Sequence, residues 1–272
     1  MTIHRVAVAL VAVLIAVALM QVYLGPIQRY MVPVTERILS KAVLRLPARA
    51  GDKFVILTID DAPSSRTEEI VELLKRHNAN ATFFIHTDQI AGREAAMETL
   101  AAQGHDIGHH MPWDTPAFRM SRKKFDDDFA RADAALRAYG DAAPRYFRPP
   151  YAAYRAGIMD PTLTRLGYDR PLAVLGSERR YVLASFIAWD AGGATNSGNP
   201  EKDRQAASRY TNQLLENLYP GAIVVFHDGE EKDRNARLDA TVYSLERFLK
   251  GAKANGYEVL SLSEGVTRAA KN

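Results

Sequence analysis

The 272-residue chain contains no cysteine. This absence excludes disulfide bonds, thiolate metal sites and a cysteine nucleophile, so a metal ion would have to be held by Asp, Glu or His. Neither sign of charge dominates, because the formal net charge is only +3. With 47% hydrophobic and 25% charged residues, the composition is that of a globular protein, and it excludes wholesale disorder and a collagen-like chain.

The small surplus of positive charge lies at the N-terminal end. Residues 1–53 contain seven Lys and Arg residues and two acidic residues, a balance of +5, whereas the rest of the chain has a balance of −2. A basic surface is the electrostatic signature of nucleic-acid binding. Because the main part of the chain lacks it, we expect no nucleic-acid partner.

An uncharged apolar run covers residues 6–24, after a tail of residues 1–5. In a helix this run would reach roughly 28 Å, close to the hydrocarbon thickness of a bilayer. We expect an uncleaved transmembrane signal anchor; a cleaved signal peptide is the alternative, because Ala16-Val17-Ala18 resembles a cleavage site. The main domain is therefore expected outside the cytoplasm, on the periplasmic or extracellular face, either membrane-anchored or secreted after cleavage.

Residues 25–52 are expected to form a basic stalk or linker. Within it, apolar and basic residues follow helical spacing over 35–46, which predicts either an amphipathic helix on anionic lipid or a plain stalk helix. The remaining domain then covers residues 53–272.

Short apolar runs alternate with longer amphipathic stretches from residue 53 onward. This pattern is typical of βα units around a mainly parallel sheet, and the number of units favours a (β/α) barrel of the α/β class, complete or incomplete, over an open sheet. A capping box at 65–68 is expected to open the first helix of the domain, over 69–76. The predicted strands are 54–59, 81–85, 106–108, 146–148, 185–189, 223–226 and 258–261.

Candidate catalytic residues follow the predicted strands. Asp60 and Asp61 end the first strand, and since adjacent strand residues point to opposite sides, one could bind a metal while the other acts as a base. The third strand is followed by His109, which should point away from the site, and by His110 and Asp114. If His110 and Asp114 face one point, they would form a three-ligand metal site with Asp61.

Two further segments carry candidate functional groups. Arg148 stands in a stiff Arg-Pro-Pro-Tyr loop, where its guanidinium could clamp a carboxylate. His227 is the first polar residue after the apolar run 223–226, a natural place for a general acid. A capping or core histidine is the alternative for this position.

Taken in order, these motifs resemble those of the NodB-homology polysaccharide deacetylases, carbohydrate esterase family 4, over residues 54–262. The resemblance implies a distorted, incomplete (β/α) barrel of the NodB type and metal-dependent removal of acetyl groups from sugars. The matching motifs are Thr-Ile-Asp-Asp at 58–61, Gly-His-Asp-Ile-Gly-His-His at 104–110, Arg-Pro-Pro-Tyr at 148–151, Trp-Asp at 189–190 and Ile-Val-Val-Phe-His-Asp at 223–228.

The resemblance also implies a role for each matching residue. Asp60 corresponds to the catalytic base, Arg148 to the arginine that orients it and His227 to the general acid, while Asp61 and His110 correspond to metal ligands. The residues expected to contact substrate are Pro149, Tyr151, Trp189 and Val225. The backbone N–H of Tyr151 would stabilise the oxyanion, and Val225 would line the pocket for the acetyl methyl group.

Two positions depart from the family pattern. The second metal-binding histidine is replaced by Asp114, so the expected ligand set is Asp61, His110 and Asp114, with Zn²⁺ as the expected ion and Co²⁺, Mn²⁺ or Ni²⁺ as alternatives. The motif Trp-Asp is not followed by the usual acidic residues, so Asp190 either polarises His227 or merely ends its strand.

The implied function is a metal-dependent hydrolase that removes N-acetyl or O-acetyl groups from a cell-envelope or extracellular glycan. Two alternatives are a deformylase or amidase acting on a lipid-linked or small substrate, and a degenerate, membrane-tethered glycan-binding protein. The expected partners are the acetylated glycan and the membrane, and the catalytic domain is expected to be monomeric.

Overall fold

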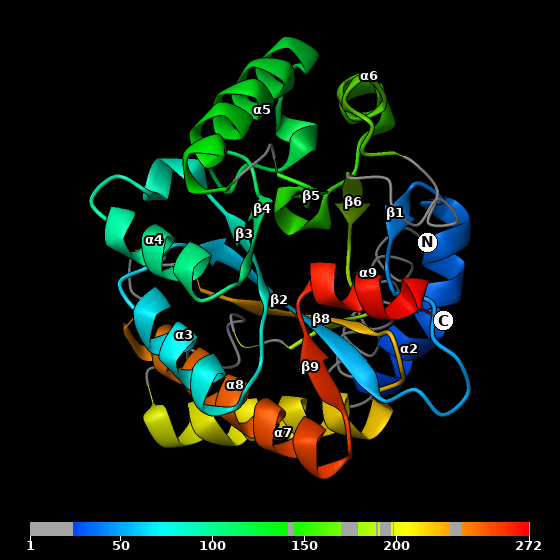
Figure 1. Ribbon diagram of the computed structural model, residues 1–272, viewed down its shortest axis with the longest axis vertical. Helices are drawn as coiled ribbons and strands as arrows, with labels where there is room; N and C mark the ends of the chain where they lie inside the picture. Colours follow the sequence, from blue (N-terminus) through cyan, green and yellow to red (C-terminus); the bar gives the residue numbers. More distant parts are fainter. Residues whose placement is uncertain are drawn as a thin grey trace, which may run out of the picture.

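A computed structural model describes residues 24–140, 144–169, 179–188, 190, 197, 199–228 and 235–271 (Figure 1). Within these residues, all strands join one parallel sheet, in the order β1-β6-β5-β4-β3-β2-β8-β7, and β9 pairs with the start of β2. The strands are β1 (Ala42–Val43), β2 (Phe54–Ala62), β3 (Thr82–Ile85), β4 (Asp106–His109), β5 (Tyr146–Phe147), β6 (Arg180–Val182), β7 (Phe186–Ile187), β8 (Ile223–His227) and β9 (Glu258–Leu260).

Helices follow most of these strands. Figure 1 shows most of them around the outside of the curled sheet, whereas α9 lies across its middle and packs against the inward-facing side chains. This is the expected incomplete barrel of βα units. The α-helices are α2 (Leu24–Ile38), α3 (Thr67–Arg76), α4 (Glu94–Ala102), α5 (Arg122–Leu136), α6 (Ala156–Leu166), α7 (Pro200–Asn217), α8 (Asn235–Ala254) and α9 (Leu262–Ala270). Single 3₁₀ turns occupy η1 (Thr87–Gln89), η2 (Ala117–Arg119), η3 (Arg137–Tyr139) and η4 (Pro150–Ala152).

The central strands are apolar on both faces, because helices cover the outside of the sheet and side chains fill the inside. On β2, Val55, Leu57 and Ile59 pack outward among helices, whereas Phe54 and Ile56 pack inward against Phe84, Ile223 and Leu262. Both sets are fully buried. Near-continuous apolar strands are the signature of a parallel sheet covered on both sides.

The expected strands are all present, with ends that differ by one to three residues. β1 and β6 were not predicted, because they are only two and three residues long and carry too little pattern to detect. The capping box predicted at 65–68 is also absent: α3 begins at Thr67, and its N-cap residue Arg66 makes no side-chain capping hydrogen bond.

The segment predicted as a stalk is packed into the domain in its described part. β1 pairs with β6, and the Leu46 N–H donates to the Gly221 carbonyl at 2.8 Å, just before β8. Val32, Val43 and Leu46 are 5% exposed or less. The helix predicted over 35–46 is wrong, because α2 ends at Ile38 and β1 follows it.

The apolar run 6–24 lies outside the described residues except for its last residue. Among the helices that the structure does describe, none combines the length and the apolar character needed to span a bilayer.

Candidate active site

The polar residues singled out in the sequence gather at the carboxyl edge of the sheet. Because the strands are parallel, all their carboxyl ends meet there. Asp60 and Asp61 lie just before the last residue of β2, and Arg148 follows β5. β8 ends in His227, which pairs in register with Asp60. His110 follows β4 in the same way, so separate sequence motifs form one site.

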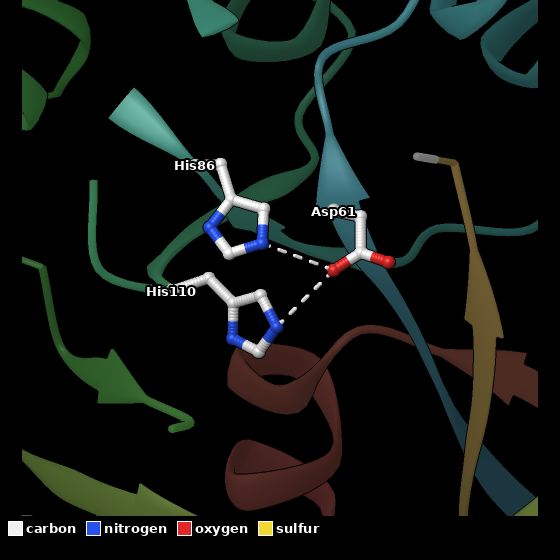
Figure 2. A group of neighbouring side chains, drawn as sticks. All are labelled: Asp61, His86 and His110. Atoms are coloured by element: carbon white, nitrogen blue, oxygen red, sulfur yellow. Dashed lines mark hydrogen bonds and ion pairs between the residues drawn. The ribbon is translucent and has the colours of Figure 1, made fainter. Parts of the chain in front are cut away.

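Two of these side chains, Asp61 and His110, form a candidate metal site together with His86, which directly follows β3 (Figure 2). Asp61, His86 and His110 each offer one ligand atom, and these atoms lie within 4.8 Å of one another. Figure 2 shows both imidazoles pointing at the same carboxylate oxygen: Asp61 Oδ1 lies 3.1 Å from His86 Nε2 and 3.4 Å from His110 Nε2. Two imidazoles and a carboxylate are a common protein ligand set for catalytic zinc.

Backbone carbonyls fix the orientation of both histidines. His110 Nδ1 lies 2.7 Å from the Arg148 carbonyl oxygen, and His86 Nδ1 lies 3.3 Å from that of Met111. A carbonyl accepts only, so each Nδ1 carries a hydrogen, and Nε2 is the nitrogen that each ring turns toward Asp61 and can offer to a metal ion in place of a proton. This is the outer-shell arrangement that orients histidine ligands toward a metal ion.

The backbone turns Asp61 out of the line of its strand. Its φ of 66° lies in the left-handed region, which aspartate tolerates better than most residues. Burial opposes ionisation of this carboxyl, yet hydrogen bonds with His110 and His86 hold its pKa well below the usual range. Burial likewise lowers the pKa of His110, but the charges of Asp60 and Asp61 raise it overall. Metal binding would therefore displace a proton from this cluster.

Asp60 does not face away from Asp61 as the alternation of strand residues predicts, because the left-handed φ of Asp61 interrupts that alternation. Both carboxylates approach His110 Nε2, Asp61 Oδ1 at 3.4 Å and Asp60 Oδ2 at 3.9 Å. Arg148 Nη1 donates to Asp60 Oδ1 at 2.6 Å, and both residues are buried. The guanidinium also donates to the Leu183 carbonyl at 2.8 Å and to Thr58 Oγ1 at 2.9 Å. With these contacts the arginine cannot swing away, so it holds the Asp60 carboxyl group in one orientation.

His227 is held from behind by Asp190. The His227 Nδ1 lies 3.0 Å from Asp190 Oδ1, and the His227 backbone N–H donates to Asp190 Oδ2 at 2.8 Å. Thr241 Oγ1 also donates to Oδ2, at 3.0 Å. Burial lowers the pKa of the imidazole, but the Asp190 carboxylate outweighs burial and raises it to about 9. His227 is therefore protonated at neutral pH, as a general acid requires.

A fourth carboxyl group, that of Asp228, is completely buried behind the site. It accepts hydrogen bonds from Ser64 Oγ at 2.6 Å and Thr67 Oγ1 at 2.5 Å, and its backbone N–H donates to the Asp60 carbonyl at 2.8 Å. Burial raises its pKa to about 7, against the opposing effect of the two hydroxyl groups. Asp228 thus ties the end of β8 to the loop that follows β2.

The structure does not bring Asp114 into the metal cluster. The left-handed φ of 66° at Met111 turns the chain, and the bends that follow leave Asp114 exposed at the surface. A spacing of four residues places two side chains together only on a helix, and residues 110–114 are not helical. The third position is taken by His86, which the sequence analysis missed.

The expected substrate-contacting residues lie around this edge wherever they are described. Pro149 is buried beside Arg148, and Tyr151 has a φ of 59° and an exposed side chain. Val225 is buried on β8, on the same side of the strand as His227. Trp189 lies outside the described residues.

The remaining histidine of the His-His pair points away from the site, as predicted, and has a structural role. His109 stacks on the Phe129 ring, with centroids 4.1 Å apart, and its Nε2 lies 3.1 Å from the Phe129 carbonyl oxygen. Burial lowers its pKa to about 4, so it stays neutral. It belongs to the packing between β4 and α5.

Comparisons with known proteins point in the same direction. Residues 48–170 match the family model described as polysaccharide deacetylase. A chitooligosaccharide deacetylase of Bradyrhizobium is 27% identical over 225 residues, which cover 79% of this chain and 91% of that protein. A peptidoglycan-N-acetylglucosamine deacetylase of Listeria monocytogenes is 26% identical over 83% of this chain, although the match spans only 41% of the Listeria protein.

The fold also matches a solved structure. A peptidoglycan N-acetylglucosamine deacetylase superposes with a TM-score of 0.66 at 20% identity, over 82% of this chain and 92% of that one. From the curled parallel sheet, the family match and these relatives, we conclude that the chain carries a polysaccharide deacetylase domain of the NodB type.

Proposed function

We propose that the protein is a metal-dependent carbohydrate deacetylase that hydrolyses N-acetyl groups of an amino-sugar glycan and releases acetate. One observation carries the proposal. The cluster of Asp61, His86 and His110 lies on the same edge of the sheet as two further groups. These are Asp60, which Arg148 holds in place, and His227, which is hydrogen-bonded to Asp190.

Asp61, His86 and His110 would hold the metal ion. Their two imidazole nitrogens and one carboxylate oxygen fit Zn²⁺ better than the two-carboxylate set expected from the sequence, and Co²⁺, Mn²⁺ or Ni²⁺ remain alternatives. When bound, such an ion polarises the amide carbonyl and makes water more acidic.

Asp60 would accept the proton of the attacking water. Its Oδ1 is occupied by Arg148, and its Oδ2 lies 3.9 Å from His110 Nε2, on the side of the metal cluster. The guanidinium fixes the orientation of this carboxyl group, as proton transfer from a positioned water requires.

His227 would donate a proton to the departing amine. Its Nδ1 faces Asp190, so its Nε2 is the atom left to serve the substrate. In the net reaction, water cleaves the C–N bond of the acetamide to give acetate and the free amino sugar. Tyr151 would support the developing oxyanion through its backbone N–H, and Val225 would contact the acetyl methyl group.

The substrate class follows from the relatives and from the N-terminal sequence. The relatives are named as deacetylases of chitooligosaccharides and of peptidoglycan N-acetylglucosamine. The uncharged run at 6–24 supports a membrane-anchored enzyme with its catalytic domain outside the cytoplasm. We therefore favour a cell-envelope glycan.

Acetate release tests this proposal directly. The protein, supplemented with each metal, is assayed on acetylated chitooligomers, peptidoglycan and acetylated xylan. We expect Asp60→Asn to reduce the rate by about 10²–10⁴-fold, the usual contribution of a general base, while binding metal normally. Asp127→Asn, a substitution on the exposed face of α5, serves as the control. Full activity of Asp60→Asn would refute the role of the base.

A further inference from the structure

α2 exposes more large apolar surface than any other element in the described part of the chain. Tyr30 is 77% exposed, Met31 49%, Val34 46% and Ile38 74%. Residues 30, 34 and 38 follow i, i+4, i+8 spacing, so they form one continuous stripe. A helix at a water-exposed surface normally presents polar side chains there. The stripe therefore marks a face that contacts something other than water.

The opposite face of α2 is firmly attached to the domain. Val32 is 3% exposed, and α2 packs along α7. Gln28 Oε1 accepts a hydrogen bond from the Ile187 N–H of β7 at 2.6 Å. The exposed stripe is thus a fixed surface of the folded domain.

The charges around the stripe suit an anionic lipid surface. The acidic residue of α2, Glu36, is paired with Arg45 through two hydrogen bonds of 2.9 and 3.0 Å. Arg29 and Arg37 are exposed. Basic residues beside an exposed apolar face are typical of helices that lie in a membrane interface.

The sequence before α2 identifies the occupant. The uncharged run 6–24 ends where α2 begins, and Tyr30 lies six residues, about 9 Å of helix, after its last residue. If that run anchors the protein, as proposed above, the first residue of the stripe stays within about 9 Å of the end of the anchor. A second copy would have to compete with lipid that is already present.

We infer that α2 lies in the membrane interface, with Tyr30, Met31, Val34 and Ile38 facing the lipid. This inference rests on the proposed membrane anchor. The attachment of α2 also relates the membrane to the site. Gln28 of α2 is hydrogen-bonded to Ile187 of β7. Ile187 pairs in register with Val225, which lies two residues before His227 on β8. The start of α2 therefore lies beside the catalytic edge, which favours glycan close to the membrane surface as substrate.

The absence of cysteine makes a site-specific test direct. Val34→Cys and Ile38→Cys variants of the full chain are spin-labelled, reconstituted in phosphatidylglycerol-containing nanodiscs and measured by power-saturation electron paramagnetic resonance. We expect each spin label to collide severalfold more often with lipid-soluble oxygen than with a water-soluble nickel complex. A label at Lys253→Cys, exposed on α8, is the control and should show the reverse preference.

The possible failures are distinguishable. If the labels at 34 and 38 behave like the control while the protein stays bound to the nanodiscs, the interfacial position of α2 is refuted and the proposed anchor still stands. Protection from both relaxation agents with dipolar broadening would overturn it in favour of contact between two copies. Protein that does not stay with the nanodiscs would refute the anchor itself, and the interfacial position of α2 with it.

Discussion

Removal of His86 should cost most of the metal affinity, whereas removal of Asp114 should cost none. The apparent binding free energy of structural zinc in small four-ligand sites is about 10–16 kcal/mol, or roughly 3–4 kcal/mol for each ligand. His86 is one of the three ligands that the described residues bring together, and its ring is already oriented by the Met111 carbonyl. We therefore expect His86→Ala to weaken zinc binding by about 10²–10³-fold.

Competition with a chromophoric chelator measures this difference in affinity. Protein stripped of metal is titrated with zinc in the presence of the chelator, in parallel for the wild type, His86→Ala and Asp114→Ala. Wild-type affinity in His86→Ala, together with a large loss in Asp114→Ala, would refute the ligand set read from the structure.

A stability control separates loss of a ligand from loss of the fold. His86 is fully buried, so its truncation leaves a cavity and removes the hydrogen bond to the Met111 carbonyl, a cost of about 1–3 kcal/mol. Unfolding measured in excess chelator reports this cost alone. The reasoning requires that the variant stay folded under the titration conditions.

Two further predictions concern pH. Asp190→Asn should lower the pKa of His227 from its raised value near 9, because the carboxylate that stabilises the imidazolium is gone. The alkaline limb of the profile of kcat against pH should therefore move to lower pH. An unchanged alkaline limb would contradict the role of Asp190. Burial raises the folded-state pKa of Asp228 to about 7, above its unfolded value near 4, so the native state binds the extra proton. The stabilisation is present below pH 4 and is lost as pH rises through 7, by up to 1.4 kcal/mol per unit. Denaturant unfolding between pH 5 and 8 should show a smaller loss for Asp228→Asn than for the wild type.

The sequence predicted most of the site because its chemistry lies at strand ends. An apolar run locates a strand, and the first polar residues after it must lie at the carboxyl edge of a parallel sheet. This reasoning placed Asp60, Asp61, Arg148 and His227 correctly at one edge. It applies equally to His86, which directly follows the apolar run of β3, so the signal for the missed ligand was present in the sequence.

The error at Asp114 has a different origin. Spacing along the chain predicts proximity only when the local conformation is known, and the left-handed residue Met111 was not predictable from the residue type. The N-terminal stalk was misassigned for a related reason. β1 is stabilised by pairing with β6, more than 130 residues away, and a local pattern carries no information about that contact.

The register between β2 and β8 has a consequence for how this domain can diversify. Asp60 and His227 are direct partners across two neighbouring strands, and the Asp228 N–H extends the same ladder. The backbones that carry the proton acceptor and the proton donor are therefore held at the spacing of hydrogen-bonded strands, about 4.8 Å. Loops at the rim can lengthen, shorten or change composition without altering that spacing. Specificity for a new glycan can thus evolve in the loops while the acid–base pair stays unchanged.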